Sequence, residues 1–117
     1  MEIFKGAARL PDRIAVYVPS TVDVDGDGRE LAERKTKETA AALSSMFGGC
    51  TITNASGCWV SDKDGLVTEA VKIIYANAAP GEIAKHADDI LQIARSIKTD
   101  MKQEAVSIEL NSVLYLV

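Results

Sequence analysis

Hydrophobic and polar positions in the first half of the chain change from a period of two to a helical period. Residues 13–18 alternate strongly and weakly apolar side chains, which predicts a strand, and a β-prone stretch at residues 3–10 lies before the Pro11-Asp12 turn. From about residue 27 to 47 the apolar positions recur every three or four residues, and Gly48-Gly49 ends this pattern. This half therefore predicts a hairpin followed by a helix.

The second half repeats the change of period. Several short strand-like stretches, with a clear turn at residues 62–65, come before a regular apolar stripe that predicts a helix over residues 80–101. Two further stretches after this helix are joined by Asn111-Ser112, a short hairpin connection. The predicted strands of this half cover residues 50–54, 57–61, 66–76, 105–110 and 113–117.

The order of these elements predicts an α+β fold of the ferredoxin-like split β-α-β type, formed by residues 1–117 as a single domain. Two helices cover one face of an antiparallel sheet, and the chain adds an extra strand at each end. The side of the long strand that bears Val71 and Ile73 is expected to meet the helices. The opposite, open face is expected to carry Tyr17, Thr51, Thr53, Lys72, Ile74, Ser107 and Glu109.

An open face of this kind is either solvated or closed by a second sheet, and we expect a homodimer. The face that bears Tyr17, Lys72 and Ile74 mixes small, polar and isolated apolar groups, so it is neither a good core nor a well-charged surface. Alternatively, a terminal strand at residues 3–10 or 113–117 pairs with its own copy, because these stretches leave backbone groups unpaired and residues 114–117 offer little charge to discourage pairing.

Charge and composition narrow the classes of protein that remain. The chain has 13 basic and 17 acidic residues, a net charge of −4, which argues against direct binding to a nucleic-acid backbone. No apolar run approaches the length of a membrane span, and the acidic start lacks the features of a signal peptide. The expectation is a cytoplasmic protein that does not contact a membrane.

Residues 23–28 resemble the opening of a calcium loop, because aspartates alternate with other residues and a glycine follows. The pattern then fails, since Arg34 stands where the bidentate glutamate of such a loop belongs. We therefore predict no metal site and no cofactor. Asp25 or Asp27 is expected instead to cap the first helix, where a carboxylate accepts backbone N–H bonds.

The residue types that most often act as nucleophiles and bases are sparse. Cys50 and Cys58 are the only cysteines, and two reduced thiols are the preferred interpretation, with a disulfide across the Asn54–Gly57 turn as the alternative. His86 is the only histidine and lies beside the apolar stripe of the second helix, as a solvated or boundary histidine would. No catalytic residues are predicted.

Aromatic and charged side chains on the predicted sheet are the candidates for binding. Trp59 either contributes apolar burial to the core or the dimer, or serves as an exposed anchor. Tyr17 could stack against a ligand or a base, and Glu69 and Tyr75 share one face of the long strand. The candidate binding residues are Tyr17, Trp59, Lys72, Ile74, Glu69 and Tyr75.

Several of these positions also belong to a set of short motifs that follow one another along the chain. The set contains Phe47-Gly48-Gly49 with Thr51, Gly57 with Trp59, Glu69 before Val71, and Gln103-Glu104 with Val106. Over about residues 13–110 this order resembles a family of small bacterial proteins of unknown function with FGG-T, G-W and QE-V motifs. The motifs are mostly turn glycines and core residues, so the resemblance implies a fold and no activity.

Two classes of function remain. The sequence contains no G-x-S-x-G, P-loop or G-x-G-x-x-G pattern, and the chain is small and acidic. We therefore predict a non-enzymatic module that binds another protein, comparable to the phage or mobile-element accessory inhibitors of nucleic-acid enzymes called anti-CRISPR proteins. The alternative is a dimeric α/β-barrel, a small-ligand-binding protein or enzyme with a pocket between its helices and sheet.

Overall fold

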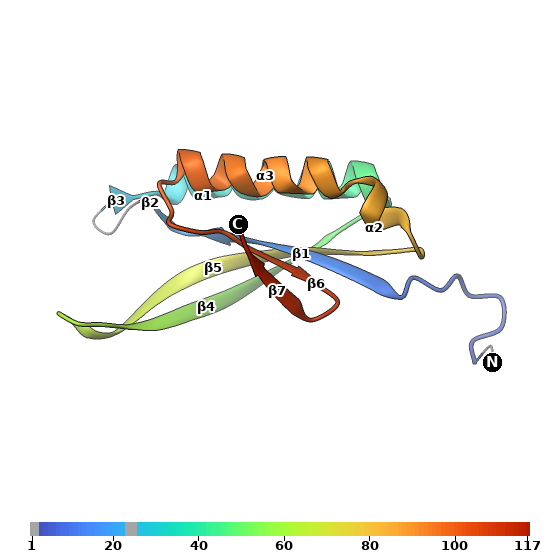
Figure 1. Ribbon diagram of the computed structural model, residues 1–117, viewed down its shortest axis with the longest axis horizontal. Helices are drawn as coiled ribbons and strands as arrows, with labels where there is room; N and C mark the ends of the chain where they lie inside the picture. The colour runs from blue at the N-terminus through green and yellow to red at the C-terminus, as the bar shows by residue number, and fades with distance from the viewer. Residues whose placement is uncertain (1–2, 23–25) are drawn as a thin grey trace.

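A computed structural model describes residues 3–22 and 26–117, and in it a five-stranded sheet carries its helices on one face (Figure 1). The strands of this sheet are β1 (Asp12–Pro19), β4 (Thr51–Ser61), β5 (Gly65–Ala78), β6 (Ser107–Leu110) and β7 (Val113–Leu116). The helices are α1 (Arg29–Phe47), the short α2 (Glu82–Lys85) and α3 (Ala87–Asp100). Two very short strands, β2 (Thr21–Val22) and β3 (Gly26–Asp27), pair with each other before α1.

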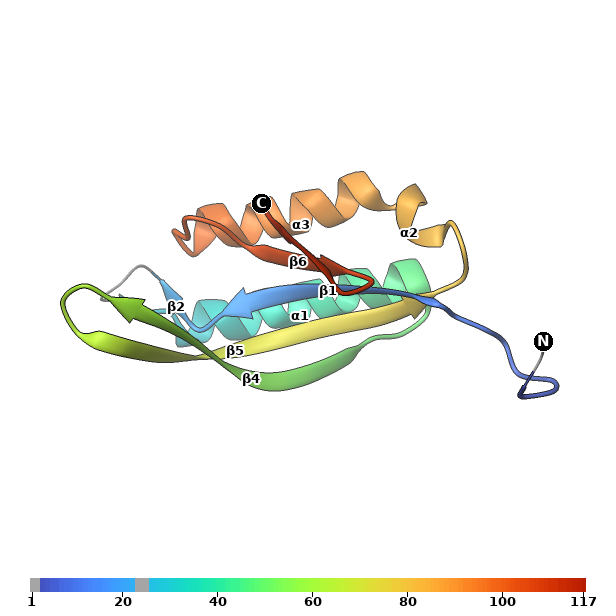
Figure 2. The same ribbon diagram turned by 60° about the horizontal axis from the view of Figure 1, so that its bottom comes forward.

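The strands lie in the order β4-β5-β1-β6-β7, and each neighbouring pair is antiparallel. The first strand therefore sits between two strands that come much later in the chain, which is the split β-α-β arrangement. This confirms the predicted α+β, ferredoxin-like fold, with β7 as an added strand at one edge. Figure 2 shows the long β4–β5 hairpin at the other edge, where its tip extends past the N-terminal end of α1.

The core lies between the helices and one side of the sheet. Buried positions of α3 are spaced by four and three residues, which places them on a single stripe facing the strands. The largest side chains with almost no exposed surface are Leu43, Ile74, Ile97, Met101, Val16 and Val18. No helix among the described residues is long and apolar enough to cross a membrane.

An ion pair joins the two long helices at the edge of this core. The Lys35 ammonium donates to Ser96 Oγ at 2.9 Å and lies 2.5 Å from Asp100 Oδ2, while the rest of its side chain is buried. Burial by itself lowers the pKa of Lys35, but the bonds to Asp100 and Glu38 outweigh that effect and leave the pKa raised. The same contact lowers the pKa of Asp100.

Several element boundaries differ from those predicted. Residues 3–10 form no strand, and residues 51–61 form one continuous strand without a turn at 54–57. The second predicted helix is divided at His86 into α2 and α3. Gly28, rather than Asp27, is the residue that precedes α1, so Asp27 does not occupy the predicted cap position. Asp25 lies outside the described residues.

The side chains of β5 face the opposite way from the prediction. Ile74 pairs with Val16 and is 0% exposed, so it belongs to the core and is unavailable for the binding role predicted for it. Lys72 shares its side of the strand by the two-residue period, whereas Ile73 and Tyr75 lie on the open face. The reason is that β5 is apolar on both sides, so the pattern alone leaves its orientation undetermined.

Candidate functional site

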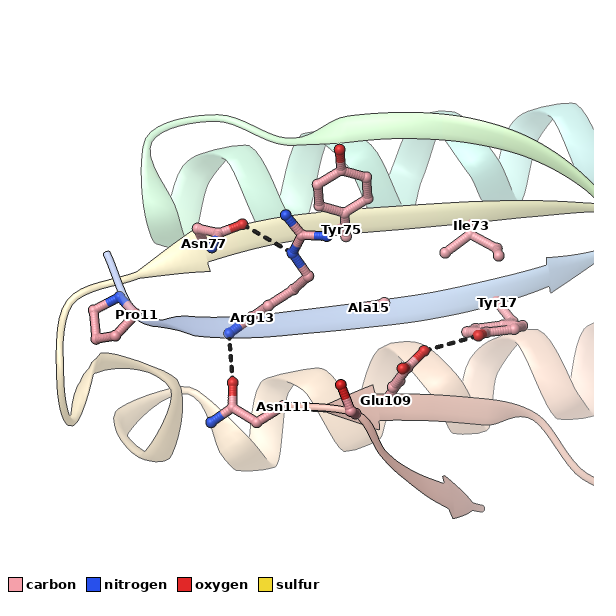
Figure 3. A pocket seen from close by; sticks show the side chains of 10 residues that line it. Pro11, Arg13, Ala15, Tyr17, Ile73, Tyr75, Asn77, Glu109 and Asn111 are labelled. Atoms are coloured by element: carbon pink, nitrogen blue, oxygen red, sulfur yellow. Dashed lines mark hydrogen bonds between the residues drawn. The ribbon is translucent and has the colours of Figure 1, made fainter. Parts of the chain in front are cut away.

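The open face of the sheet contains a hollow of about 520 Å³, shown in Figure 3. This volume lies within the range of ordinary small-molecule sites. Three strands and the turn that follows β6 contribute to its wall. The lining residues are Pro11, Arg13, Ala15, Tyr17, Ile73, Tyr75, Asn77, Glu109, Asn111 and Ser112.

The hollow exists because a small residue lies between two large ones. Arg13, Ala15 and Tyr17 project from the same side of β1, since alternate residues of a strand share a face. Ala15 is paired across the sheet with Tyr75 on one side and Glu109 on the other. A methyl group at this central position leaves room that a longer side chain would fill.

Tyr17 and Glu109 form a hydrogen-bonded pair at one end of the hollow. The Tyr17 hydroxyl donates to Glu109 Oε2 at 2.8 Å, as Figure 3 shows. This bond, burial and the negative charge of Glu109 all raise the pKa of Tyr17. The phenol therefore stays protonated at neutral pH and acts as a donor that fixes the position of the carboxylate.

The other end of the hollow carries a positive charge. The Arg13 guanidinium lies 4.2 Å from the centre of the Tyr75 ring, a cation–π contact, and its Nε donates to Asn77 Oδ1 at 3.1 Å. Asn111 Oδ1 accepts a 2.8 Å bond from the Arg13 backbone N–H, which ties the β6–β7 turn to β1. The hollow thus presents a cation at one end and a carboxylate at the other, an arrangement suited to a ligand with both charges.

A second hollow, of about 760 Å³, lies between the first half of α1 and the neighbouring parts of β4 and β5. Its wall includes Lys72, whose ammonium donates to Asn54 Oδ1, and also Glu33 and Lys37 of the helix. This hollow corresponds to the pocket between helices and sheet that the alternative prediction required. Its polar groups line a mainly small and apolar surface.

The predicted binding residues are therefore dispersed. Tyr17 and Tyr75 meet in the open-face hollow, and Lys72 lies in the other one. Glu69 accepts a 2.9 Å bond from Thr21 Oγ1, farther along β5, and Trp59 pairs with Val67 near the tip of the hairpin, where it is 46% exposed. The sheet brings only the two tyrosines together.

Sequence reasoning missed the polar residues that complete the open-face hollow. Arg13 and Asn77 stand at strand ends, where charged and polar residues are common and carry no distinctive signal. The sequence predicts Glu109 on the open face. A carboxylate inside a short strand is the one sequence signal that points to Glu109 as a possible binding residue. Its tyrosine partner is 92 residues away, so no local motif records the pair.

Within the described part of the chain, the cysteines and the candidate metal ligands are not gathered into a cluster. Cys50 and Cys58 are both free, so the disulfide alternative is wrong; Cys58 is exposed and Cys50 is partly buried. In residues 3–22 and 26–117, no group of three or more histidine, cysteine, aspartate or glutamate side chains could hold a metal ion. The aspartates at 23 and 25 lie outside those ranges.

Comparison with known proteins finds no matching family and no matching curated sequence. Two solved structures match over nearly their whole length. One is a phage SAM lyase in complex with S-methyl-5′-thioadenosine, with a TM-score of 0.63 and 15% identity over 94% of this chain and 93% of that one. The other is a phage SAM lyase in the apo state, with a TM-score of 0.66 and 18% identity over 95% and 94%.

These likenesses contradict the preferred prediction about function. Both matching structures are of an enzyme, a phage SAM lyase. This finding contradicts the prediction of a non-enzymatic, anti-CRISPR-like inhibitor and the expectation that enzymatic activity is absent. The alternative prediction, a small-ligand-binding protein or enzyme, agrees better. At this level of identity the likeness itself demonstrates the fold alone.

Proposed function

We propose that this chain is an enzyme that binds S-adenosylmethionine in the open-face hollow and cleaves it to S-methyl-5′-thioadenosine. The observation that carries the proposal is the likeness in fold, over 94% and 95% of the chain, to two structures of a phage SAM lyase. The chemistry of the hollow adds independent support, because its charges and rings match the parts of this ligand.

The reaction follows from the two molecules. S-methyl-5′-thioadenosine is S-adenosylmethionine without its four-carbon amino-acid part, so the bond that breaks joins the sulfonium sulfur to Cγ. The electron pair of that bond passes to sulfur, which becomes a neutral thioether. With no water consumed, the departing fragment completes its own valence. Either its carboxylate oxygen bonds to Cγ and closes a lactone, or a proton passes from Cβ to solvent water while a carbon–carbon double bond forms between Cβ and Cγ.

The lining residues offer a partner for each part of the substrate. The ring faces of Tyr17 and Tyr75 suit the adenine or the sulfonium, since aromatic faces attract both flat bases and cations. The Glu109 carboxylate, held by Tyr17, suits the positively charged amino group. Arg13 suits the carboxylate, because a guanidinium binds it through two parallel bonds.

The existing contacts of Arg13 define its role. Its guanidinium rests on Tyr75 and bonds to Asn77, so it is already oriented before substrate arrives. A carboxylate held by Arg13 at one end and an amino group held near Glu109 at the other would fix the amino-acid part across Ala15. Such fixing lowers the entropy cost of reaching the reactive geometry.

The test is to incubate the purified protein with S-adenosylmethionine and to measure S-methyl-5′-thioadenosine by liquid chromatography and mass spectrometry. The mass of the four-carbon product distinguishes the lactone from the alkene. Glu109→Gln should reduce the rate by on the order of 100-fold, because it removes a charge aimed at the substrate. Glu104→Gln, at an exposed site outside the hollow, is the matched control and should leave the rate unchanged.

Two results would contradict the proposal. If the wild-type protein forms no more product than a reaction without protein, the proposed activity is wrong. If Glu109→Gln and Glu104→Gln both retain the wild-type rate, the activity exists but lies outside the open-face hollow.

A further inference from the structure

We propose that the second hollow binds a small organic anion, an apolar body that carries one carboxylate. The hollow measures about 760 Å³, within the range of ordinary small-molecule sites. It forms beside the first half of α1, where the β4–β5 hairpin curves away from the helix layer (Figure 1). Lys72 and Ile73 are neighbours on β5 and line one hollow each, so this site is separate from the open-face hollow and does not rest on the proposed function.

An apolar surface at this hollow is in contact with water, although it belongs to the helix side of the sheet. Ile52 and Ile74 lie directly opposite each other on β4 and β5, so they share a face. Ile74 is 0% exposed beneath the helices, whereas Ile52 is 46% exposed at the hollow. Ala32 of the helix and Ala70 of the hairpin add small apolar side chains to the wall. A ligand with an apolar body would remove this surface from water, which is favourable.

The charges around the hollow are mainly positive, although the whole chain is acidic. The wall carries one carboxylate, that of Glu33, and three cations, Arg29, Lys37 and Lys72, in a chain of net charge −4. The N-terminal end of α1, where the helix dipole is positive, also contributes, because Arg29 is the first residue of that helix. The hollow therefore favours an anion over a neutral or cationic ligand of the same shape.

Lys72 is the side chain best placed to receive the carboxylate. Its ammonium donates to the side-chain oxygen of Asn54, its partner across the strand pair, and this neutral acceptor orients the ammonium without neutralising its charge. An ammonium has three N–H donors, and the bond to Asn54 occupies one of them. A ligand carboxylate can accept from another in a charge-assisted hydrogen bond. Lys37 lies one helical turn after Glu33, a spacing at which the two can pair, so it is the weaker candidate.

The test uses octanoate and octanamide, which share an apolar chain and differ in charge. Isothermal titration calorimetry should show saturable binding of octanoate, with octanamide weaker by roughly tenfold because it lacks the charge. Acetate, which has the charge without the chain, should not bind. Two-dimensional NMR of ¹⁵N-labelled protein should place octanoate at the amides of Ile52 and Lys72, and not at Arg13 or Tyr17 of the open-face hollow.

Three variants separate the charge from the cavity. Lys72→Gln should weaken octanoate by roughly tenfold and leave octanamide unchanged. Lys63→Gln is the matched control, because Lys63 is exposed in the turn of the same hairpin and lies outside the lining of the hollow; both ligands should bind it as they bind the wild type. Ala70→Leu should weaken both ligands, because Ala70 is exposed and a larger side chain there would fill the hollow. Circular dichroism should show native melting for all three.

Several results would overturn the proposal. Octanoate that does not bind saturably at millimolar concentration would do so, and so would octanoate and octanamide of equal affinity. Amide shifts gathered at the open-face hollow would show that the anion binds there instead. Equal octanoate affinities of Lys72→Gln and Lys63→Gln would indicate general attraction or apolar contact alone, and would also overturn it. Formation of S-methyl-5′-thioadenosine, measured on the same samples, tests the proposed function separately.

Discussion

Replacing Ile74 or Ile73 by alanine tests the orientation of β5, on which the position of the hollow depends. The two residues are adjacent and chemically identical, but Ile74 is 0% exposed in the core while Ile73 lines the open-face hollow and is partly exposed. Ile74→Ala removes three carbons from a packed site, where such a change costs about 2–5 kcal/mol. Ile73→Ala removes the same atoms where water already has access, so we expect a loss of about 1 kcal/mol.

The difference is large enough to measure. For a chain of this size each kcal/mol lowers the melting temperature by roughly 4 °C, so Ile74→Ala should lower it by about 8–20 °C and Ile73→Ala by about 4 °C. The assay is urea and thermal unfolding followed by circular dichroism at several protein concentrations, which separates folding from association. Equal losses from the two variants, or a larger loss from Ile73→Ala, would refute the orientation of β5 described here.

Three further changes test other parts of the account. Ile90→Asp places a charge in the buried stripe of α3 at a cost of several kcal/mol, so circular dichroism should show no cooperative unfolding; native-like melting would contradict the packing of helix on sheet. Lys35 lowers the pKa of Asp100, so their contact stabilises the fold fully at pH values above the ordinary pKa of an aspartate carboxyl. This stabilisation is lost as the pH falls through the lowered pKa of Asp100 in the folded protein. Asp100→Asn should therefore make unfolding easier at pH 7 and reduce the loss of stability on acidification, in urea titrations across that range. Calcium should neither bind saturably at micromolar concentration nor raise the melting temperature, because residues 23–28 lack the bidentate ligand; calorimetry decides this.

The arrangement of elements could be predicted because its signals are local. Gly48 ends α1 with a left-handed backbone, φ 86°, and Gly65 stands in the β4–β5 turn with φ 70°, so both turns are visible in the sequence itself. The stripe of α3 is equally local, since its period is set by the helix. These features define the number and order of most elements without knowledge of their partners.

The orientation of β5 could not be predicted for a physical reason. Val71, Ile73 and Tyr75 alternate with Ile74 and Ala76, so both sides of the strand are apolar over much of its length. The choice between the two sides is made by pairing with β1, which places Ile74 beside Val16. Only the assembled sheet contains that information.

Familiar sequence motifs give no sign of the open-face hollow. The open-face hollow uses an arginine, two tyrosines and a glutamate from three strands, and none of these lies in a recognisable local pattern. Sites of this kind are assembled by the fold, and common residue types acquire a role through their neighbours. The prediction of a non-enzymatic module treated the lack of a motif as the lack of a site.

The proposed function requires that the open-face hollow bind the nucleoside product, S-methyl-5′-thioadenosine. The most direct test is a titration of ¹⁵N-labelled protein with S-methyl-5′-thioadenosine, followed by two-dimensional NMR of the backbone amides. Saturable shifts are expected at Arg13, Tyr17, Tyr75 and Glu109, while Lys37 beside the second hollow should be unchanged. Shifts concentrated around Lys37, or no shifts at millimolar ligand, would contradict it.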